Sequence, residues 1–551
     1  MTKNITLAKD LKIGELDAEA DSKLLDSCFI DNGYLEQLID VKNPKSVILG
    51  RTGSGKSALL YKLEQSVAKC KRLDPHDISI KFLEHSDIIN FFESLDIKLD
   101  LFYRMLWRHI IILELLKLRY DFNASFSSQS SIFRNFLDWF KDNNERKAYE
   151  YFHQWGDKFW LETDEQLKQI TSKLESETKA TLGANSQIIK AGAEGLSRYS
   201  EEQITDIKRK ANQVIDGSQL ANLNHILDTL NESAFNDSQK KFYLIIDQLD
   251  EDWANTSTRC KFIRALIEEI KSFRKLSQIK IVIALRKDLL QLVFDQTRDS
   301  GFQEEKYESY ILDILWQPKD LRNLIEKRIN QVFKFQYTNG NITFDDLFPS
   351  PRKKGGQLAF DFLIERTLRR PRDILQFVNT CFQKSSDNKI SWRALLAAEA
   401  IYSNKRLNSL SEEWSQIYPS FLDIVEILRG KKASISRSNL TGEALQEIIF
   451  SLYERNEMDS CIEISKKFIE PKSTIKESEI LSQILVALYK TGTIGIKVSS
   501  LETFIWSYID QPIITVGEAK RATSIKIHKM LHRALDIVLE QSDIYSNEDY
   551  V

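Results

Sequence analysis

Residues that break helices or cross-link chains are scarce in this sequence. Its 551 residues include only 19 glycines and 9 prolines, the two residue types least favourable in a helix. The five cysteines stand far apart and form no Cys-x-x-Cys pair, which excludes the usual structural zinc site. An odd number of cysteines behind a polar, acidic N-terminus that is no secretory signal is typical of reduced thiols. We therefore expect a helix-rich, cytoplasmic protein.

Long apolar runs and a surplus of one charge are lacking as well. The longest apolar stretches, such as residues 110–116, are far shorter than a membrane-spanning helix and are interrupted by charge, so we expect no membrane association. Lysine and arginine number 77 against 80 aspartates and glutamates, which gives a net charge of −3. This balance excludes nucleic-acid binders that depend on a large basic surplus, but it leaves room for a local basic surface.

A glycine-rich motif stands between a predicted strand and a predicted helix. GRTGSGKS, residues 50–57, fits the pattern G-x-x-x-x-G-K-[ST], and it follows a β-branched run at 46–49. Its glycines allow successive backbone N–H groups to converge on phosphate oxygens, and the following helix adds the positive end of its dipole. We expect a nucleoside triphosphate here, with Lys56 at the β- and γ-phosphates and the Ser57 hydroxyl on Mg²⁺. The predicted binding loop comprises Gly50, Arg51, Thr52, Gly53, Ser54, Gly55, Lys56, Ser57 and Ala58.

A second chemical signal is an apolar run, residues 242–246, that ends in an acidic segment. Beside a phosphate loop, an aspartate at the end of a neighbouring strand holds Mg²⁺ and its water shell, and Asp247 occupies that position. Asp250 and Glu251 follow within one turn, and either carboxylate could polarise the attacking water, with Glu251 preferred. The alternative is a strand that ends in a solvated acidic loop, and without the phosphate loop the two interpretations would be equally supported.

Arginines stand at two further positions that suit contact with a γ-phosphate. Arg286 follows the apolar run 279–285, where a cation at a strand end can sense the phosphate, and its alternative role is a surface salt bridge. Near Pro371, which suits the first turn of a helix, guanidinium groups could clamp the phosphate from a lid or act on a neighbouring subunit. Arg372 is the preferred sensor, and the alternative is a basic helix end that pairs with acidic neighbours. The arginines of this second group are Arg366, Arg369, Arg370 and Arg372.

These motifs together resemble a known family. GRTGSGKSALL, FYLIIDQLDEDW, IKIVIALRKDLL and RRPRDILQFVN are similar to the STAND and KAP-like branch of AAA+-type P-loop ATPases, and more closely to a group of bacterial single-chain P-loop ATPases. The resemblance implies an α/β fold with an ASCE-type parallel sheet, in which another strand separates the acidic strand from the phosphate-loop strand. It also implies ATP rather than GTP, and nucleotide-controlled oligomerisation or switching. Relatives occur in bacterial anti-phage defence and in mobile elements.

One position departs from the pattern of related motors. In most hexameric AAA+ motors the residue after the Mg²⁺ aspartate is the glutamate that activates water, whereas here it is Gln248. An amide cannot accept a proton, although it can orient water as glutamine does in some GTPases. The base is then Asp250 or Glu251, or hydrolysis is slow.

The order of motifs predicts several domains. A β-like run at 78–84 is followed by a long helical pattern, which we interpret as an insertion before the acidic strand. The predicted parts are an N-terminal lead-in (1–40), a P-loop ATPase core (41–340) with a helical insertion (86–235), a helical lid (341–400) and a C-terminal helical, winged-helix-like domain (401–551).

The winged-helix prediction depends on the last part of the chain. A helix over 478–490, two short strands in TGTIGIKV and ETFIWSYI, and a final helix around 524–540 give the pattern of that fold. Its basic residues could meet DNA phosphates, and the alternatives are a solvated helix face or protein contacts. They are Lys490, Lys497, Lys520, Arg521, Lys526, Lys529 and Arg533.

The sequence therefore predicts an ATPase that binds Mg²⁺ and ATP and acts as a switch. No hydrolase triad and no nuclease or deaminase module is recognisable, so the output would pass through a homo-oligomer, a partner protein or DNA. Two alternatives stay open: an ORC-like ATP-dependent DNA-binding protein, and a regulatory scaffold that binds ATP with little turnover.

Overall fold

Two hydrophobic cores divide the chain into two units. The sheet unit comprises Asp31–Arg51 and Lys56–Ile314, and the lid unit comprises Met1–Ile30, Thr52–Gly55 and Leu315–Val551. Each unit has its own cluster of buried apolar side chains. The computed structural model describes Leu7 and residues 11–73, 99–120, 201–202, 205, 235, 237–251, 256–298, 305–334, 342–385, 388–499 and 501–539.

The sheet unit is built on a five-stranded sheet in which every pairing is parallel, with the order β2-β3-β4-β1-β5. All residues of β3 are buried, as expected for a strand that is covered on both faces. The acidic strand β3 and the phosphate-loop strand β1 both pair with β4, so the predicted ASCE order is confirmed. The strands are β1 (Val47–Gly50), β2 (Cys70–Leu73), β3 (Phe242–Ile246), β4 (Ile279–Arg286) and β5 (Ile311–Asp313).

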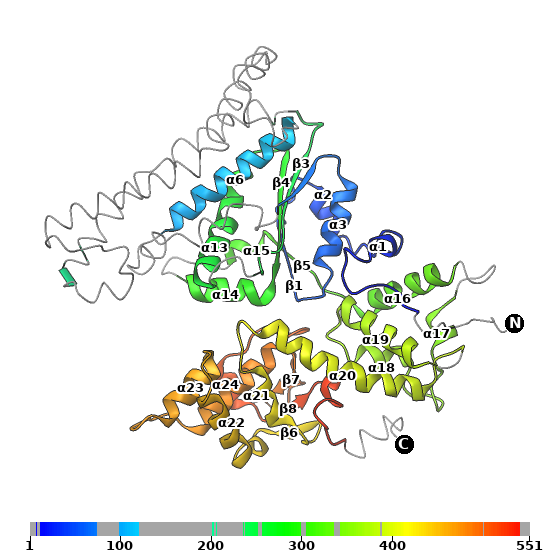
Figure 1. Ribbon diagram of the computed structural model, residues 1–551, viewed down its shortest axis with the longest axis vertical. Coiled ribbons are helices and arrows are strands. Elements are labelled where there is room, and N and C mark those ends of the chain that lie inside the picture. Colours follow the sequence, from blue (N-terminus) through cyan, green and yellow to red (C-terminus); the bar gives the residue numbers. More distant parts are fainter. Residues whose placement is uncertain are drawn as a thin grey trace, which may run out of the picture. The chain divides into compact units, whose positions relative to one another are not determined.

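Helices cover both faces of this sheet (Figure 1). Helices α6, α13 and α14 lie on one face, and α2 and α3 lie on the other. The Trp107 ring of α6 lies 4.5 Å from the Phe262 ring of α13, and a buried ion pair joins Arg108 to Glu269 on the same two helices. The helices of this unit are α2 (Tyr34–Ile39), α3 (Lys56–Ser66), α6 (Asp100–Tyr120), α13 (Thr256–Phe273), α14 (Lys287–Thr297) and the short α15 (Glu305–Glu308).

Parts of the sequence prediction for this unit fall outside the described residues. The β-like run at 78–84 lies there, and so does most of the predicted insertion 86–235, of which α6 is described as helical. Strands β2 and β5 were not predicted from the sequence. The division into lead-in, core, lid and C-terminal domain stays a prediction.

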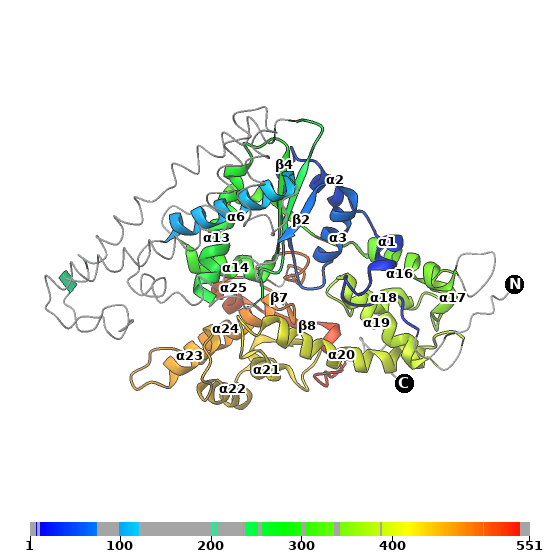
Figure 2. The ribbon, with the colours of Figure 1, turned by 45° about the horizontal axis from the view of Figure 1, so that its top comes forward.

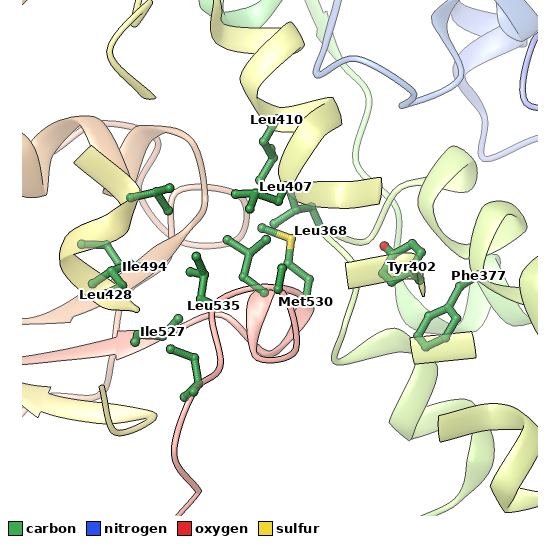
Figure 3. Close-up of a cluster of buried hydrophobic side chains, with 14 of the residues drawn as sticks. Leu368, Phe377, Tyr402, Leu407, Leu410, Leu428, Ile494, Ile527, Met530 and Leu535 are labelled. Atoms are coloured by element: carbon green, nitrogen blue, oxygen red, sulfur yellow. The ribbon is translucent and has the colours of Figure 1, made fainter. Parts of the chain in front are cut away.

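The first half of the lid unit is a group of packed helices. Pro371 stands at the first position of α19, where its missing N–H has no helical partner to lose. The apolar face of α19 packs on α20, and the Phe377 and Tyr402 rings stack with centroids 4.3 Å apart (Figure 3). These helices are α1 (Ser22–Cys28), α16 (Pro318–Phe333), α17 (Phe344–Leu347), α18 (Ala359–Ile364), α19 (Pro371–Lys384) and α20 (Trp392–Trp414).

The second half of the lid unit contains an antiparallel sheet of three strands in the order β6-β8-β7. Helix α24 leads into β7 and packs against α25 (Figure 2). The same core extends to Met530, next to Leu407 of α20 (Figure 3). The elements are α21 (Phe421–Val425), η2 (Glu426–Leu428), β6 (Ser434–Ser436), η3 (Arg437–Leu440), α22 (Glu443–Tyr453), α23 (Ser460–Ile469), α24 (Glu477–Lys490), β7 (Ile494–Lys497), α25 (Val516–Arg521), β8 (Ser524–Ile527) and η4 (Lys529–Leu531).

This sheet corrects two details of the winged-helix prediction. The segment ETFIWSYI forms only an isolated bridge, between Ile505 and Ile496, and its Trp506 ring packs on Gly495 instead of extending the sheet. The second strand is β8, which lies where the sequence predicted the start of a final helix. Ile525 and Ile527 are buried and alternate with more exposed residues, a two-residue period that indicates a strand.

Among the helices of the described residues, none combines the length and the apolar character that crossing a membrane requires.

Candidate nucleotide-binding site

The glycine-rich motif links the end of β1 to the start of α3, as the sequence predicted. Gly53 and Gly55 have φ of 76° and 94°, in the left-handed region that other residues rarely adopt. A Cβ on Gly53 would lie 2.7 Å from Cβ of Arg372, so this position has no room for a side chain. Both the conformation and the close approach therefore require glycine.

Lys56 is the first residue of α3 and folds back over the loop. Its Nζ donates hydrogen bonds to the carbonyl oxygens of Gly50 at 3.1 Å and Arg51 at 3.3 Å. Burial lowers the pKa of Lys56, and the negative charge of Asp250 opposes that shift. Ser57 is exposed and Ala58 is half-buried in the same turn. The lysine charge is thus held over the loop by two of the loop's own carbonyl oxygens.

Asp247 follows β3 at the same edge of the sheet as the loop. Because β1 and β3 both run parallel to β4, their carboxyl ends lie at one edge. The Asp247 Oδ1 accepts the Gln248 N–H at 2.9 Å, and Oδ2 lies 3.8 Å from Nη1 of Arg72 on β2. Burial raises the pKa of Asp247, while the Gln248 N–H and Arg72 act in the opposite direction. Arg72 was not identified from the sequence.

The turn after Asp247 carries the two candidate bases. Gln248 has φ of 60°, a left-handed conformation that is uncommon for a residue with a side chain. The Glu251 N–H donates to the Gln248 carbonyl at 3.2 Å, and the exposed Glu251 accepts a hydrogen bond from Arg259 through its own carbonyl. Asp250 lies 3.8 Å from Arg286. Asp250, Arg286 and Lys56 therefore form one group of charges at this edge, which we call the edge cluster.

Arg286 ends β4 directly beside the phosphate loop, since it is the register partner of Gly50. Its Nε donates to Oδ1 of Asp288 at 3.1 Å, and its Nη2 pairs with Oδ2 of the same carboxylate. Asp288 lies in the first turn of α14 and was not identified from the sequence. It orients the guanidinium at the edge where the loop begins.

Within the lid unit, three groups bind the tip of the loop, Thr52–Gly55. Each donates a hydrogen bond to one of three successive carbonyl oxygens of the tip. Trp316, which precedes α16, was not identified from the sequence. The three bonds run from Arg370 Nη1 to the Thr52 oxygen at 2.7 Å, from the Arg372 N–H to the Gly53 oxygen at 3.3 Å, and from Trp316 Nε1 to the Ser54 oxygen at 2.8 Å.

The four arginines of the lid have different surroundings. Arg366 is fully buried against Glu399, with Nε and Oε1 2.5 Å apart, so the alternative interpretation of a basic helix end with acidic partners holds for it. Arg370 is likewise buried, and its partners are Asp373 and Glu413. Arg369 and Arg372 are only half-buried, with Arg372 lying on the loop tip. They remain the candidates for contact with a γ-phosphate.

The donor set of the loop fits Mg²⁺ and a triphosphate. Such a ligand needs backbone N–H groups around left-handed glycines, a lysine over the loop and a carboxylate at a strand end of the same sheet edge, and all three are present. The buried hydroxyls of Thr52 and Ser54 have no hydrogen-bond partner among the described residues, and phosphate oxygens are suitable acceptors for them. Ser57 and Asp247 are the residues that would hold the metal.

The chain is similar to known proteins both in the lid segment alone and over most of its length. Residues 319–411 match the family described as FunZ-associated C-terminal helical domain, a segment that runs from α16 through most of α20. Over 514 residues the chain is 25% identical to the putative transposon gamma-delta 80.3 kDa protein of Escherichia coli. That alignment covers 90% of this chain and 63% of the relative, so the chain spans less than two thirds of the relative's length.

Two solved structures are also similar. The Walker-type ATPase of Pyrococcus abyssi has a TM-score of 0.34 and 12% identity, with 90% of this chain and 96% of that chain covered. Cdc6p from Pyrobaculum aerophilum has a TM-score of 0.27 and 12% identity, with 93% of this chain and 98% of that chain covered.

Proposed function

We propose that this protein binds ATP with Mg²⁺ and hydrolyses it to ADP and phosphate, and that it acts as a nucleotide-controlled switch. The observation that carries this proposal is the sheet order. It places the phosphate loop after β1 and Asp247 after β3 at one edge, on either side of β4. A loop of this sequence without the acidic strand beside it would support only anion binding.

Each residue at this edge has a role in the proposed reaction. Lys56 contacts the β- and γ-phosphates and stabilises charge as the bond to the leaving group breaks. Ser57 and Asp247 hold Mg²⁺, which neutralises negative charge on the phosphates. Arg286, in register with Gly50, supplies a further cation near the γ-phosphate.

The attacking water needs a carboxylate, and the contacts favour Asp250 over the sequence-based preference for Glu251. Asp250 lies 3.8 Å from Arg286 and its charge acts on Lys56, so it belongs to the cluster that surrounds the phosphates in this proposal. Gln248 contributes no base. Because Asp250 is three residues past Asp247, hydrolysis is slow compared with a motor that has the carboxylate adjacent.

The proposed output passes through the lid unit. Arg372 lies on the loop tip and is the candidate sensor of the γ-phosphate, either in its own chain or across an oligomer. A homo-oligomer, a partner protein or DNA receives the signal. The transposon protein among the relatives supports a setting in mobile DNA, and the resemblance to the STAND and KAP-like group supports a role in anti-phage defence.

The decisive test is Lys56→Ala. We expect loss of ATP binding in calorimetry and loss of phosphate release, because the loop loses the cation that contacts the β- and γ-phosphates in this proposal. The matched control is Lys62→Ala on the same helix α3, which leaves both unchanged. Full ATP affinity and full turnover in a pure Lys56→Ala protein would disprove the assignment.

A second candidate function is DNA binding by the C-terminal part of the lid unit. The observation in its favour is the β6-β8-β7 sheet, with α24 directly before β7 as the helix precedes the wing in winged-helix proteins. Against it, α24 is buried along most of its length from Ile480 to Tyr489 and is packed against α25. The switch is therefore the better-supported function.

A further inference from the structure

The tip of the phosphate loop is bound by the lid unit through its carbonyl groups. Three consecutive peptides of the tip each have their oxygen in a hydrogen bond, and all three donors come from the lid unit. They are the Arg370 side chain, the Arg372 backbone and the Trp316 indole, bound to the oxygens of Thr52, Gly53 and Ser54.

This arrangement determines where the N–H groups of the tip point. In a planar trans peptide the C=O and N–H bonds point in opposite directions. Fixing the oxygens of residues 52, 53 and 54 on one side therefore turns the N–H groups of Gly53, Ser54 and Gly55 toward the other side. Convergent N–H groups in a glycine-rich turn form an anion-binding concavity.

Glycine makes such a loop easy to misalign. A peptide next to a residue without a Cβ can rotate at low cost, and a rotated peptide would present an oxygen, with its partial negative charge, to a phosphate. Trp316 and Arg370 oppose that rotation at the two ends of the tip. The ring of Trp316 also lies 3.7 Å from the position a Cβ would take on Gly55, so it packs on the loop as well as binding it.

Both donors are themselves held in place. Trp316 packs against the core of the lid unit and directly precedes α16, whose start is fixed by a capping box between Gln317 and Asp320. The Arg370 guanidinium is bound by Asp373 at 3.1 Å and by Glu413 at 3.0 Å. Glu413 lies near the end of α20, the long helix that leads into the C-terminal half of the unit.

We propose that Trp316 and Arg370 are positioning residues that hold the loop tip in its anion-binding form, and that phosphate affinity therefore depends on the lid unit. This role presupposes the nucleotide binding of the proposed function. The ligand class is a polyphosphate, since the groups that the two residues orient are backbone N–H groups, which bind phosphate oxygens and do not distinguish one nucleobase from another.

The test is Trp316→Phe, which keeps an aromatic ring and removes the indole N–H. Loss of one hydrogen bond that orders the loop is expected to weaken binding of a non-hydrolysable ATP analogue and of inorganic tripolyphosphate about five- to tenfold. The matched control is Trp392→Phe, because the Trp392 indole donates to the Ser350 oxygen at 2.9 Å in the same unit. The control is expected to bind both ligands as the wild type does.

Thermal unfolding separates positioning from a general loss of structure. Without ligand, the midpoint of Trp316→Phe is expected to equal that of Trp392→Phe, and only the shift caused by tripolyphosphate is expected to shrink. Arg370→Lys is a second variant, which keeps the charge between Asp373 and Glu413 and shortens the reach toward Thr52, with the same expected loss of affinity.

The outcomes distinguish this role from the proposed function. If the wild type binds tripolyphosphate and Trp316→Phe binds it equally well, the positioning role is overturned and the proposed function stands. If the wild type binds neither ligand, both are overturned. Equal weakening in Trp316→Phe and Trp392→Phe also overturns the positioning role.

Discussion

The charge clusters of the two units contain the same residue types but differ in burial. At the edge of the sheet unit, the Arg286 and Asp250 side chains are 18% and 37% exposed and stand 3.8 Å apart. In the lid unit, the Arg366 and Glu399 side chains are at most 2% exposed and 2.5 Å apart. Partly exposed charges can change partners at a lower cost than buried ones, because either charge of a fully buried pair would be desolvated without its partner. We therefore expect the less buried cluster to be the one that can rearrange around a ligand and the buried cluster to be structural.

The strongest way to break this comparison is to remove one arginine from each cluster. Arg366→Met removes the closest and most buried cation of Glu399, since Arg533 is more distant and more exposed, so we expect a loss of unfolding free energy of about 3 kcal/mol. Arg286→Met removes the closest cation of Asp288, whose side chain is 7% exposed, so we expect a smaller loss of about 1–2 kcal/mol, together with an ATP turnover lowered about 100-fold. Denaturant titration and phosphate release measure the two effects.

The reverse pattern would refute the division. If Arg366→Met stays as stable as the wild type but loses turnover, the lid arginine belongs to the reaction. If Arg286→Met unfolds as readily as Arg366→Met, the edge cluster is structural.

A smaller effect is expected at the left-handed residue of the sheet edge. Gln248→Glu places a carboxylate directly after Asp247, the position that activates water in most hexameric AAA+ motors, and we expect phosphate release to rise about tenfold. Gln248→Gly is the control, since it relieves the left-handed backbone and offers no base. We expect it to be more stable by about 0.5 kcal/mol with no gain in turnover. An equal gain in both variants would assign the effect to the backbone rather than to a base.

The sequence predicts those parts of this edge whose signal lies within a few consecutive residues. The loop was identified from its motif, and β3 and β4 were identified from their apolar runs. Strands β2 (CKRL) and β5 (ILD) were missed because they are short and partly polar, and their extended form comes from pairing with β3 and β1. Arg72 and Asp288 follow from that tertiary arrangement and not from a motif.

The roles of the lid arginines also depend on tertiary contacts that the sequence alone does not reveal. Arg366, Arg370 and Arg372 stand within one short segment and have equivalent sequence contexts. Their surroundings differ because carboxylates far along the chain pair with two of them, Glu399 with Arg366 and Glu413 with Arg370. Trp316 carried no sequence signal, because its partner is a backbone oxygen of the loop.

The smallest effect is expected at the basic residues near β8. Lys529 forms an ion pair with Glu365 at 2.6 Å, and the two side chains are 29% and 43% exposed. Such pairs contribute little, so Lys529→Gln is expected to lower the unfolding free energy by only about 0.5 kcal/mol, which denaturant titration can measure against Arg366→Met.

A comparison of Lys529 with Lys520 tests the alternative function of DNA binding. Lys520 is exposed on α25, whereas Lys529 already has a carboxylate partner. For a protein that contacts DNA phosphates through this surface, Lys520→Gln lowers affinity for duplex DNA at low salt and reduces the salt slope by about one, while Lys529→Gln changes neither. A larger effect of Lys529→Gln would mean that the pair with Glu365 opens on DNA. Absence of duplex binding by the wild type at low salt would remove the DNA alternative and leave the switch to act through protein partners.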